Sequence, residues 1–363
     1  MPSRARLIRL AVGTMLVAAM TLPASGVVAN SSANASLKHV FVIMLENHSQ
    51  STVIGDPNAP YITSLAQDYG EATNYYGVTH PSLPNYVAAI SGSNWFVQSD
   101  DPSVRFDNTN LVDQLESHGK TWAAYMEAMP ANDKLADSWP EEHNALYASK
   151  HNPFVLFTDI RASGARMANI KPYSDFAGDL NSGHVADFVW ISPDQCNDMH
   201  GGVYTAVAGH PETPCPYGSA VDDANDAALK QKADAFVQTA VETITSSKAW
   251  TGNSAIFILT DENDYTGNTT NGGWESTAGC CDSPVVQAGD TRISATWPGG
   301  TYGGGLIPAV VVTTHGVRHY ASDTAYNHYS LLRTIEEAWS LGYLGNASDA
   351  NNVSSMKEFF SHH

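Results

Sequence analysis

The stretch "HVFVIMLEN", residues 39–47, joins an unbroken apolar run to an acid and an amide. A run of Val, Phe, Ile and Leu without alternating polar residues is typical of a strand that is buried on both faces, as in a parallel sheet. The run passes directly into Glu46 and Asn47. We therefore predict a central strand over residues 39–45 whose carboxyl end presents a carboxylate and an amide.

Segments of the same kind recur along the chain and alternate with helical patterns. Further strands are predicted at residues 121–126, 154–160, 185–192, 255–260 and 307–313. Helices are predicted at residues 61–69, 85–91, 110–119, 222–247 and 328–339. This alternation predicts an α/β fold, in which a mostly parallel sheet is covered by helices on both faces.

The ends of the chain differ in composition from its middle. Residues 1–29 carry arginines, then a short apolar run, then small residues, which is the layout of a secretory signal peptide. We expect an exported protein without stable membrane insertion. Residues 36–346 are interpreted as a single domain, and the Gly-, Thr-, Asn- and Ser-rich residues 264–305 as a loop-rich insertion in it. Residues 347–363 are expected to form a loosely packed tail.

The net charge bears on the kind of partner that the protein can bind, and the cysteines bear on whether it contains disulfides or a zinc site. The formal net charge of −19 argues against a nucleic-acid partner, because such a surface repels phosphate backbones. Four cysteines in an exported chain favour disulfides, for which three pairings exist. We favour a Cys196–Cys215 pair, which closes a short loop. A zinc site is the weaker alternative, because Cys280 and Cys281 are adjacent and lack the usual ligand spacing.

Acids follow two of the predicted strands directly. Glu46 and Asn47 follow the first strand, and Asp261 and Glu262 follow the strand at 255–260. The carboxyl ends of parallel strands lie at one edge of the sheet, where ligands bind. Each acid taken alone would be an ordinary turn residue, but clustered carboxylates repel one another unless a cation joins them. The pattern therefore predicts a site for one divalent cation, Mg, Ca, Mn, Zn or Fe.

Two more strand ends are expected to reach the same edge. The strand at 185–192 is followed by Asp194, Asp198 and His200, and the strand at 307–313 by His315. We assign Asp194 as a further metal ligand, with Asp198 as the alternative. His200 stands beside glycines that allow a ligand to approach closely.

The segment "THPSLPNY", residues 79–86, places hydroxyl groups at the start of a predicted helix. Ser82 lies near the N-cap, where its ordinary role would be capping. A helix N-terminus also offers free N–H groups and a positive dipole end to a phosphate. A hydroxyl held there next to a bound cation loses its proton more easily and can attack phosphorus.

Five motifs in this order resemble one family: "VFVIMLENHS", "THPSLPNY", "NDMHGG", "TDEN" and "HYSLLRTIEEAW". They are similar to the phosphoesterase family of bacterial acid phosphatases and non-specific phospholipases C, within the alkaline-phosphatase superfamily. The resemblance covers most of residues 38–345. It is strongest to secreted bacterial acid phosphatases, some of which act on phosphatidylinositol 3-phosphate, and it implies an alkaline-phosphatase-like fold.

The resemblance also implies roles for single residues. Glu46 and Asn47 match the family's metal-binding pair, Asp261 and Glu262 match its later acidic pair, and Ser82 stands where relatives carry the nucleophile. Thr79 remains a rival nucleophile. His200 and His328 match histidines that bind metal or phosphate. The full ligand set of two-zinc relatives is missing, which favours a single metal ion.

The sequence therefore suggests an acid phosphatase that cleaves phosphate monoesters through a phosphoseryl intermediate. His80, His200 and His328 would bind the phosphate or protonate the leaving group, and Asn85 is assigned to phosphate binding. Below a pH of ~6.5 these histidines would be cationic, which would favour acidic conditions. The expected partner is a small phosphate ester or a phospholipid head group. A phospholipase C-type phosphodiesterase and a non-enzymatic, metal-stabilised binding module are the alternatives.

Overall fold

Strand β1 (Val40–Leu45) is buried along its whole length, as its composition predicts. In the computed structural model, which describes residues 36–183, 185–218, 223–264 and 277–360, it lies inside the central sheet. Its side chains divide between two cores, because successive strand residues point to opposite faces. Val40, Val42 and Met44 belong to one hydrophobic cluster, whereas Phe41, Ile43 and Leu45 belong to the other.

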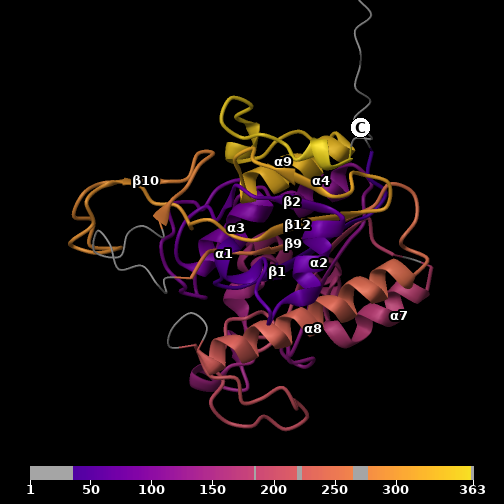
Figure 1. Ribbon diagram of the computed structural model, residues 1–363, viewed down its shortest axis with the longest axis horizontal. Helices are drawn as coiled ribbons and strands as arrows, with labels where there is room; N and C mark the ends of the chain where they lie inside the picture. Colours follow the sequence, from indigo (N-terminus) through magenta and orange to yellow (C-terminus); the bar gives the residue numbers. More distant parts are fainter. Residues whose placement is uncertain (1–35, 184, 219–222, 265–276, 361–363) are drawn as a thin grey trace, which may run out of the picture. The chain divides into compact units, whose positions relative to one another are not determined.

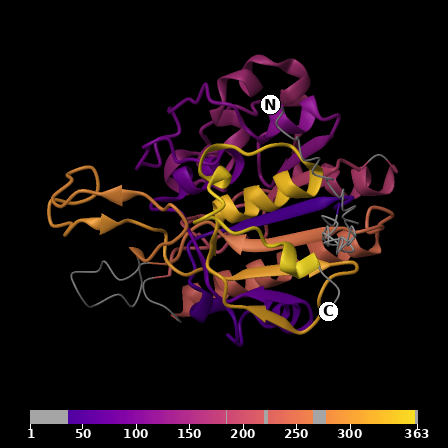
Figure 2. The same cartoon turned by 90° about the horizontal axis from the view of Figure 1, so that it is seen from above.

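Helices cover both faces of this sheet (Figure 1). One face packs against α3 (Ser82–Ser91), α4 (Leu111–Ser117), α5 (Thr158–Ala162) and α9 (His328–Trp339). The other packs against α2 (Pro60–Asp68), α7 (Phe176–Asn181) and α8 (Ala224–Ser246). In the view from above, α9 (yellow) lies alongside strand β1 (indigo) and runs in nearly the same direction (Figure 2). The expected α/β fold with helices on both faces is confirmed.

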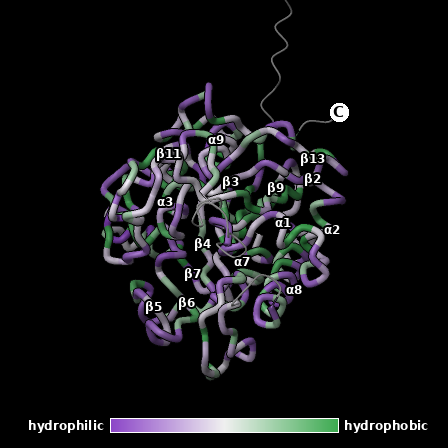
Figure 3. Tube along the Cα trace, turned by 60° about the vertical axis from the view of Figure 1, so that its left-hand side comes forward, coloured by the Kyte–Doolittle hydropathy of each residue, from purple (hydrophilic) through white to green (hydrophobic). Residues whose placement is uncertain are grey.

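The long helix α8 illustrates how a sequence pattern becomes a buried face. Leu229, Ala233, Val237, Ala240 and Ile244 recur at helical spacing and are all buried. The Asp223 side chain caps its start by accepting N–H groups at the first turn. The alternation of hydrophilic and hydrophobic stretches along α8 is visible in Figure 3. The predicted helix over 222–247 is therefore confirmed over Ala224–Ser246, and residue 222 lies outside the described residues.

The main sheet has eight strands in the order β13-β2-β12-β9-β1-β8-β4-β7. Their bounds are β2 Gly70–Ala72, β4 Trp122–Met126, β7 Ile170–Pro172, β8 Phe188–Ser192, β9 Ala255–Thr260, β12 Ala309–Thr313 and β13 Tyr320–Ser322. Neighbouring strands are parallel except at β12, which runs antiparallel to both β9 and β2. The end of β12 thus points to the opposite edge of the sheet from the ends of β1 and β9. The expectation that His315 joins their cluster is wrong.

Short elements complete the described part of the chain. The helices are α1 Gln50–Val53 and α6 Gly164–Ala168, with 3-10 helices at Glu142–Asn144, Ser149–His151, Pro153–Leu156, Tyr173–Asp175, Gly345–Ser348 and Lys357–Phe360. The small sheets pair β14 (Tyr326–Asn327) with β3 (Tyr75–Tyr76), β5 (Ser138–Trp139) with β6 (Tyr147–Ala148), and β10 (Val285–Val286) with β11 (Gly300–Thr301).

Residues 154–160 are not a strand. They form the 3-10 helix Pro153–Leu156 followed by α5. Pro153 occupies the first turn, where its missing N–H leaves no bond unmade, and it directs the chain into a helical turn. Phe154 and Phe157 remain fully buried. A short apolar run fits a buried strand and a buried helical turn equally well, so periodicity alone does not separate them.

The tail after residue 346 is packed rather than loose. Val353, Met356, Phe359 and Phe360 are buried. The Phe359 ring lies 5.5 Å from the ring of Tyr320 on strand β13. The expectation of a loosely packed tail is therefore wrong for residues 347–360, because Phe359 covers the β13–β2 edge of the sheet and the other three side chains join hydrophobic clusters of the domain.

Part of the predicted insertion, and none of the predicted signal peptide, lies within the described residues. Residues 277–305 contain the hairpin of β10 and β11, which projects away from the main sheet (Figure 1). Val286, Trp297 and Tyr302 form a small hydrophobic cluster there. Residues 265–276 and the expected signal peptide at 1–29 lie outside the described residues. Among the residues that the structure describes, no helix is long and apolar enough to cross a membrane.

Two disulfides join the four cysteines. The favoured Cys196–Cys215 pair is present and closes a loop of the chain beyond β8. The adjacent Cys280 and Cys281 are bonded to each other. No free cysteine remains to serve as a zinc ligand.

Candidate active site

The carboxyl ends of β1 and β9 lie side by side, because the two strands are parallel and in register from Val40 with Ala255 to Leu45 with Thr260. The residues that follow them are therefore neighbours. Glu46 and Asp261 are fully buried, and Glu262 is 3% exposed. The backbone N–H of Asn47 donates to Asp261 Oδ1 at 3.2 Å and ties the two strand ends together.

Ser82 meets this acid cluster at the first residue of α3. Its Oγ lies 3.0 Å from Glu46 Oε2 and 3.3 Å from Glu262 Oε1. Tyr86, one helical turn later, donates from its hydroxyl to Glu46 Oε1 at 2.6 Å. Three segments that are far apart in the sequence thus converge on one hydroxyl group, as the positions of the acids predicted.

The carboxylates in this cluster repel one another. Burial, followed by repulsion from Asp261 and Asp198, raises the pKa of Glu46 well above its ordinary value. Burial and repulsion from Glu262 raise the pKa of Asp261 in the same way. Each anion is disfavoured here unless a positive charge joins the group.

Two oxygen atoms of the cluster point to a cation. Within the part of the chain that the structure describes, Asn47 Oδ1 and Asp261 Oδ2 are buried and have no hydrogen-bond partner. Asn47 adopts a left-handed backbone conformation with φ of 44°, which is uncommon outside glycine. Unpartnered carboxylate and amide oxygens are the ligands that hard divalent cations prefer. The residues present therefore fit the single metal ion that the sequence suggested.

Two predicted histidines lie behind the acids. His80 Nδ1 is 2.5 Å from Glu262 Oε2. His328 Nε2 lies 2.6 Å from the carbonyl oxygen of Asp261, and its Nδ1 lies 3.3 Å from the Tyr75 hydroxyl. Burial lowers the pKa of His328 to about 4. Both nitrogens of His328 are thus engaged by protein atoms, so it supports the backbone of Asp261.

His200 lies on the open side of the cluster. Its Nδ1 is 2.9 Å from the carbonyl oxygen of Gly201, which requires the proton on that nitrogen. Its Nε2 then carries a lone pair and lies 3.4 Å from the Tyr217 hydroxyl. Burial, together with the charge of Lys150, lowers the pKa of His200 to about 3. The expectation of a cationic histidine cluster below a pH of ~6.5 is therefore wrong for His200, as it is for His328.

His151 completes the group and was not predicted. Its Nε2 lies 3.2 Å from Glu46 Oε1 and its Nδ1 lies 3.5 Å from Asp198 Oδ2. The ring stacks on Tyr86 with centroids 5.4 Å apart. Glu46, His151 and His200 each offer a ligand atom within 4.8 Å of the others. Sequence reasoning missed His151 because no strand end or glycine marks it; the 3-10 helix Ser149–His151 carries it to α3.

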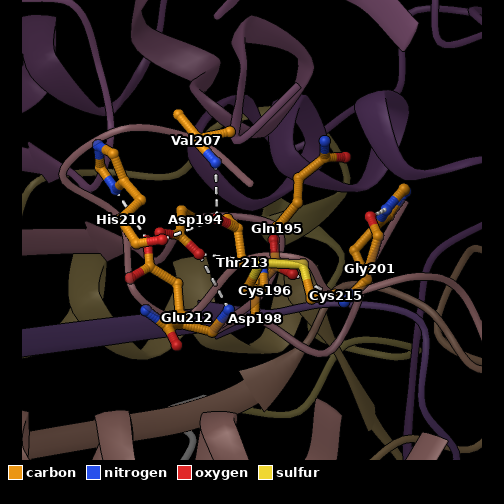
Figure 4. Close-up of a disulfide and its surroundings, with 12 residues drawn as sticks. Asp194, Gln195, Cys196, Asp198, Gly201, Val207, His210, Glu212, Thr213 and Cys215 are labelled. Carbon is orange, nitrogen blue, oxygen red and sulfur yellow. Dashed lines mark hydrogen bonds and ion pairs between the residues drawn. A yellow bond between two sulfur atoms is a disulfide. The ribbon is translucent and has the colours of Figure 1, made fainter. Parts of the chain in front are cut away.

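Asp198, and not Asp194, lies beside the acid cluster. Asp198 faces His151 and the acid cluster, and burial raises its pKa well above the ordinary value. Asp194 instead groups with His210 and Glu212 beside the Cys196–Cys215 disulfide (Figure 4). Asp194 therefore does not join Glu46, and the alternative that the sequence left open takes its place.

Thr79 and Asn85 hold the loop that precedes α3. The Thr79 hydroxyl lies within hydrogen-bond distance of Gln98 Oε1 at 3.1 Å and of the carbonyl oxygen of His80 at 3.3 Å, so it is already engaged by protein acceptors. Asn85 Oδ1 accepts the N–H groups of Val78 and Thr79, and its Nδ2 donates to the carbonyls of Thr79 and Pro81. A phosphate contact by Asn85 would require releasing one of these four bonds.

The positive end of α3 already has an anionic partner. Asp100 Oδ1 accepts the N–H of Leu83 at 2.9 Å, and Pro84 has no N–H to offer. Asp100 Oδ2 lies 2.8 Å from Lys150 Nζ. Although burial lowers the pKa of Lys150, attraction to Asp100 and Glu46 outweighs it and raises the pKa. The fixed cation near the site is thus Lys150, which the sequence did not single out.

A cavity of about 760 Å³ opens beside these residues. Its lining includes Asp100, Lys150, His200, Tyr204 and Tyr217. A volume of this size suits a small organic ligand. The cavity therefore gives a route from solvent to the wall formed by His200.

The chain is similar to acid phosphatases and to a lipid phosphatase. It is 28% identical over 334 residues to the probable acid phosphatase of Kluyveromyces lactis, which covers 88% of this chain and 62% of that protein. It is 25% identical over 327 residues to the phosphatidylinositol-3-phosphatase of Mycobacterium tuberculosis, which covers 90% of this chain and 85% of that protein. The chain thus spans less than two thirds of the length of the yeast relative.

A solved structure of a hydrolase has a similar fold. The phosphonate monoester hydrolase of Agrobacterium radiobacter matches with a TM-score of 0.50 and 12% identity, over 89% of this chain and 77% of that one. At this identity the similarity concerns the fold alone. The model of the Phosphoesterase family matches residues 56–212 and 219–342, which include Ser82, Asp261 and Glu262. The chain therefore belongs to the phosphoesterase family.

Proposed function

We propose that this protein hydrolyses phosphate monoesters as an acid phosphatase. The observation that carries the proposal is the Ser82 hydroxyl, 3.0 Å from Glu46 and 3.3 Å from Glu262, inside a buried acid cluster. A hydroxyl used only for capping would have no need of two carboxylates. The names of the yeast and mycobacterial relatives support the same reaction class.

One divalent cation would be held by Glu46, Asn47, Asp261 and Glu262. When bound, it would supply positive charge that stabilises the Ser82 oxygen and the phosphoryl oxygens. The unpartnered oxygens of Asn47 and Asp261 support its presence there. Glu46, His151 and His200 also offer ligand atoms within 4.8 Å of one another, so the two histidines are further candidate ligands for that ion.

The first chemical step is an in-line attack by Ser82. Its hydroxyl proton passes to Glu46 Oε2, the acceptor 3.0 Å away. The Ser82 oxygen forms a bond to phosphorus while the bond from phosphorus to the leaving oxygen breaks. Water in the cavity protonates the leaving oxygen, which departs as an alcohol, and a phosphoseryl group remains on the protein.

In the second step, a water oxygen bonds to phosphorus while the bond from phosphorus to the Ser82 oxygen breaks. A proton of that water passes to the Ser82 oxygen, Glu46 returns its proton to solvent, and hydrogen phosphate leaves. The Nε2 of His200 carries a lone pair because Nδ1 donates to Gly201, so it can accept a hydrogen bond from the attacking water and orient it. Lys150 supplies a fixed positive charge beside the cavity, which would attract the dianionic substrate despite the net charge of −19. Burial of the serine and the acids keeps bulk water away from the reacting group.

The substrate class follows from the cavity and from one relative. A space of about 760 Å³ lined by Lys150, Tyr204 and Tyr217 would accept the head group of a phosphoinositide as well as a small ester. The mycobacterial relative is named for phosphatidylinositol 3-phosphate. We therefore propose phosphoinositides phosphorylated at the 3-position as one substrate of this protein.

Replacement of Ser82 by alanine tests the mechanism. We expect Ser82→Ala to lower kcat on p-nitrophenyl phosphate by a factor on the order of 10³ or more, because the nucleophile is lost. Thr79→Val is the matched control, since it removes a nearby hydroxyl that faces Gln98, and it should retain most of the activity. Mass spectrometry of acid-quenched wild-type protein should find phosphate on Ser82.

Full activity in Ser82→Ala would refute this role for the serine. Faster turnover of bis-p-nitrophenyl phosphate than of the monoester would instead favour a phosphodiesterase. Phosphatidylinositol 3-phosphate and phosphatidylinositol 4-phosphate in the same assay would test the proposed positional preference.

A further inference from the structure

A second group of metal-binding side chains lies outside the Ser82 cluster. Asp194 follows strand β8, whereas His210 and Glu212 belong to the loop that the Cys196–Cys215 disulfide closes (Figure 4). One ligand atom from each of the three residues lies within 4.8 Å of the others. Two carboxylates and an imidazole are donors that zinc takes in proteins.

The side chain of Asp194 gives the strongest evidence for a bound cation in this group. Its side chain is 2% exposed. The Oδ1 atom accepts the backbone N–H groups of Cys196 at 3.0 Å and Asn197 at 3.1 Å, which fixes the carboxylate. The Oδ2 atom is buried and has no hydrogen-bond partner among the residues described. A buried, unpartnered carboxylate oxygen is costly, so this atom points to a bound cation.

The surrounding charges favour a cation at the same place. Glu127, at the end of β4, accepts the N–H of Asp194 through Oε2 at 3.0 Å. Glu127, Asp194 and Glu212 therefore bring three carboxyl groups together in a partly buried region. Their mutual repulsion would be relieved by a divalent ion.

His210 is held in place and can be reached from solvent. Its Nδ1 lies 2.8 Å from Glu212 Oε1, with 25% and 18% of the two side chains exposed. The ring packs against Trp139 at a centroid distance of 5.4 Å. A cavity of about 650 Å³ lined by Glu127, His210 and Glu212 provides an entry path for an ion.

We propose that Asp194, His210 and Glu212 bind one zinc-like divalent transition-metal ion. Zinc bonds of about 2.1 Å place tetrahedral ligand atoms roughly 3.4 Å apart, which small side-chain shifts would reach from the present arrangement. The hydrogen bond between His210 and Glu212 would be replaced by two bonds to the metal, and water would fill the fourth position. Calcium fits less well, because it prefers six to eight oxygen ligands.

This metal would fasten the disulfide-closed loop to the carboxyl end of β8. The same stretch of chain carries His200 and leads to Tyr217, which line the larger cavity. The ion would therefore stabilise one wall of that cavity without touching the reacting groups. The proposal does not depend on the phosphatase activity proposed above.

Zinc content of the full-length protein tests the proposal. The protein is equilibrated with buffered Zn²⁺, passed through gel filtration and analysed for metal. We expect His210→Gln and Glu212→Gln each to lose one equivalent of zinc. The matched controls His118→Gln and Glu242→Gln, which change exposed residues of the same types, should lose none.

A second series of variants distinguishes the ion at Asp194, His210 and Glu212 from the cation at the Ser82 cluster. Asp261→Asn should lose a different equivalent, so the double variant with His210→Gln should lose both. Zinc should raise the thermal midpoint of the His118→Gln control by a few degrees more than that of His210→Gln. Equal zinc content in His210→Gln, Glu212→Gln and the controls would overturn the proposal, as would a wild-type protein that binds no zinc.

Discussion

Lys150 changes the electrostatic picture that the composition suggests. The chain is strongly acidic, yet this single ammonium group lies beside the cavity and 2.8 Å from Asp100. Attraction to Asp100 and Glu46 keeps it protonated, despite a burial that lowers its pKa. A local positive charge of this kind can attract an anionic substrate in spite of an unfavourable net charge.

Lys150→Met should lower the efficiency with which the protein hydrolyses phosphate esters. The substitution keeps the length of the side chain and removes the charge that would meet the phosphoryl group. A charge-assisted contact contributes about 1.5–3 kcal/mol, so we expect kcat/KM to fall by roughly 10- to 100-fold. Initial rates over a range of p-nitrophenyl phosphate concentrations measure this. Lys171→Met, which changes a lysine paired with Asp179, is the control, and an equal loss in both variants would contradict the role of Lys150.

At the scale of single elements, helix α9 contains an acid in an unusual place. Glu336 is 1% exposed and lies in the last turn, where the helix dipole disfavours a negative charge. Its Oε1 accepts the N–H of Leu344 at 2.8 Å, and Oε2 has no partner among the described residues. Burial raises the pKa of Glu336 to about 8. The folded protein therefore holds a proton here that the unfolded chain releases.

Glu336→Gln should remove part of the pH dependence of stability. Between the unfolded value of 4.5 and the folded value of about 8, only the folded state binds this proton. The free energy of unfolding of the wild type should then fall as pH rises, by up to ~1.4 kcal/mol per pH unit from this group. Urea unfolding at pH 5, 6, 7 and 8 would measure the slope. A slope in Glu336→Gln identical to that of wild type and of the control Glu337→Gln would contradict the assignment.

At the scale of the whole molecule, the carboxy-terminal segment closes the edge of the sheet. Phe359 is fully buried and lies over Gly70 of β2, where a Cβ atom would come within 2.5 Å of the ring. Glu358 accepts the Tyr320 hydroxyl at 3.1 Å. The last described turn is thus packed against strands β2 and β13 and is part of the core.

Phe359→Ala should destabilise the entire domain. Removal of a buried phenylalanine costs about 3–5 kcal/mol, because the transfer free energy is lost and a cavity remains. Phe96→Ala is the control, since Phe96 is 89% exposed and its loss should change stability by about 0.5 kcal/mol or less. Chemical denaturation followed by fluorescence and by circular dichroism would measure both. A similar midpoint in the two variants would show that the tail is not part of the cooperative unit.

Several features could be predicted from the sequence because they depend on local patterns. The apolar run of β1 and the spacing of apolar residues in α8 report burial directly. The acids after β1 and β9 follow from the same patterns, since parallel strands bring their carboxyl ends to one edge. Glu46 and Asp261 could therefore be placed together from the sequence alone, whereas the nucleophile role of Ser82 beside them is what the family resemblance implies.

Other features depended on contacts between segments that are distant in the sequence. The direction of β12 decided that His315 lies at the far edge, and no residue within that strand encodes its direction. His151 and Lys150 reach the site because a 3-10 helix packs against α3, and Asp194 turns to His210 because a disulfide closes the loop between them. Periodicity records which side of an element is buried, whereas the identity of the neighbour that buries it is set by long-range packing. For that reason the sequence by itself determined the fold class and the acid cluster, and only the tertiary structure decided which histidines, which lysine and which aspartate complete it.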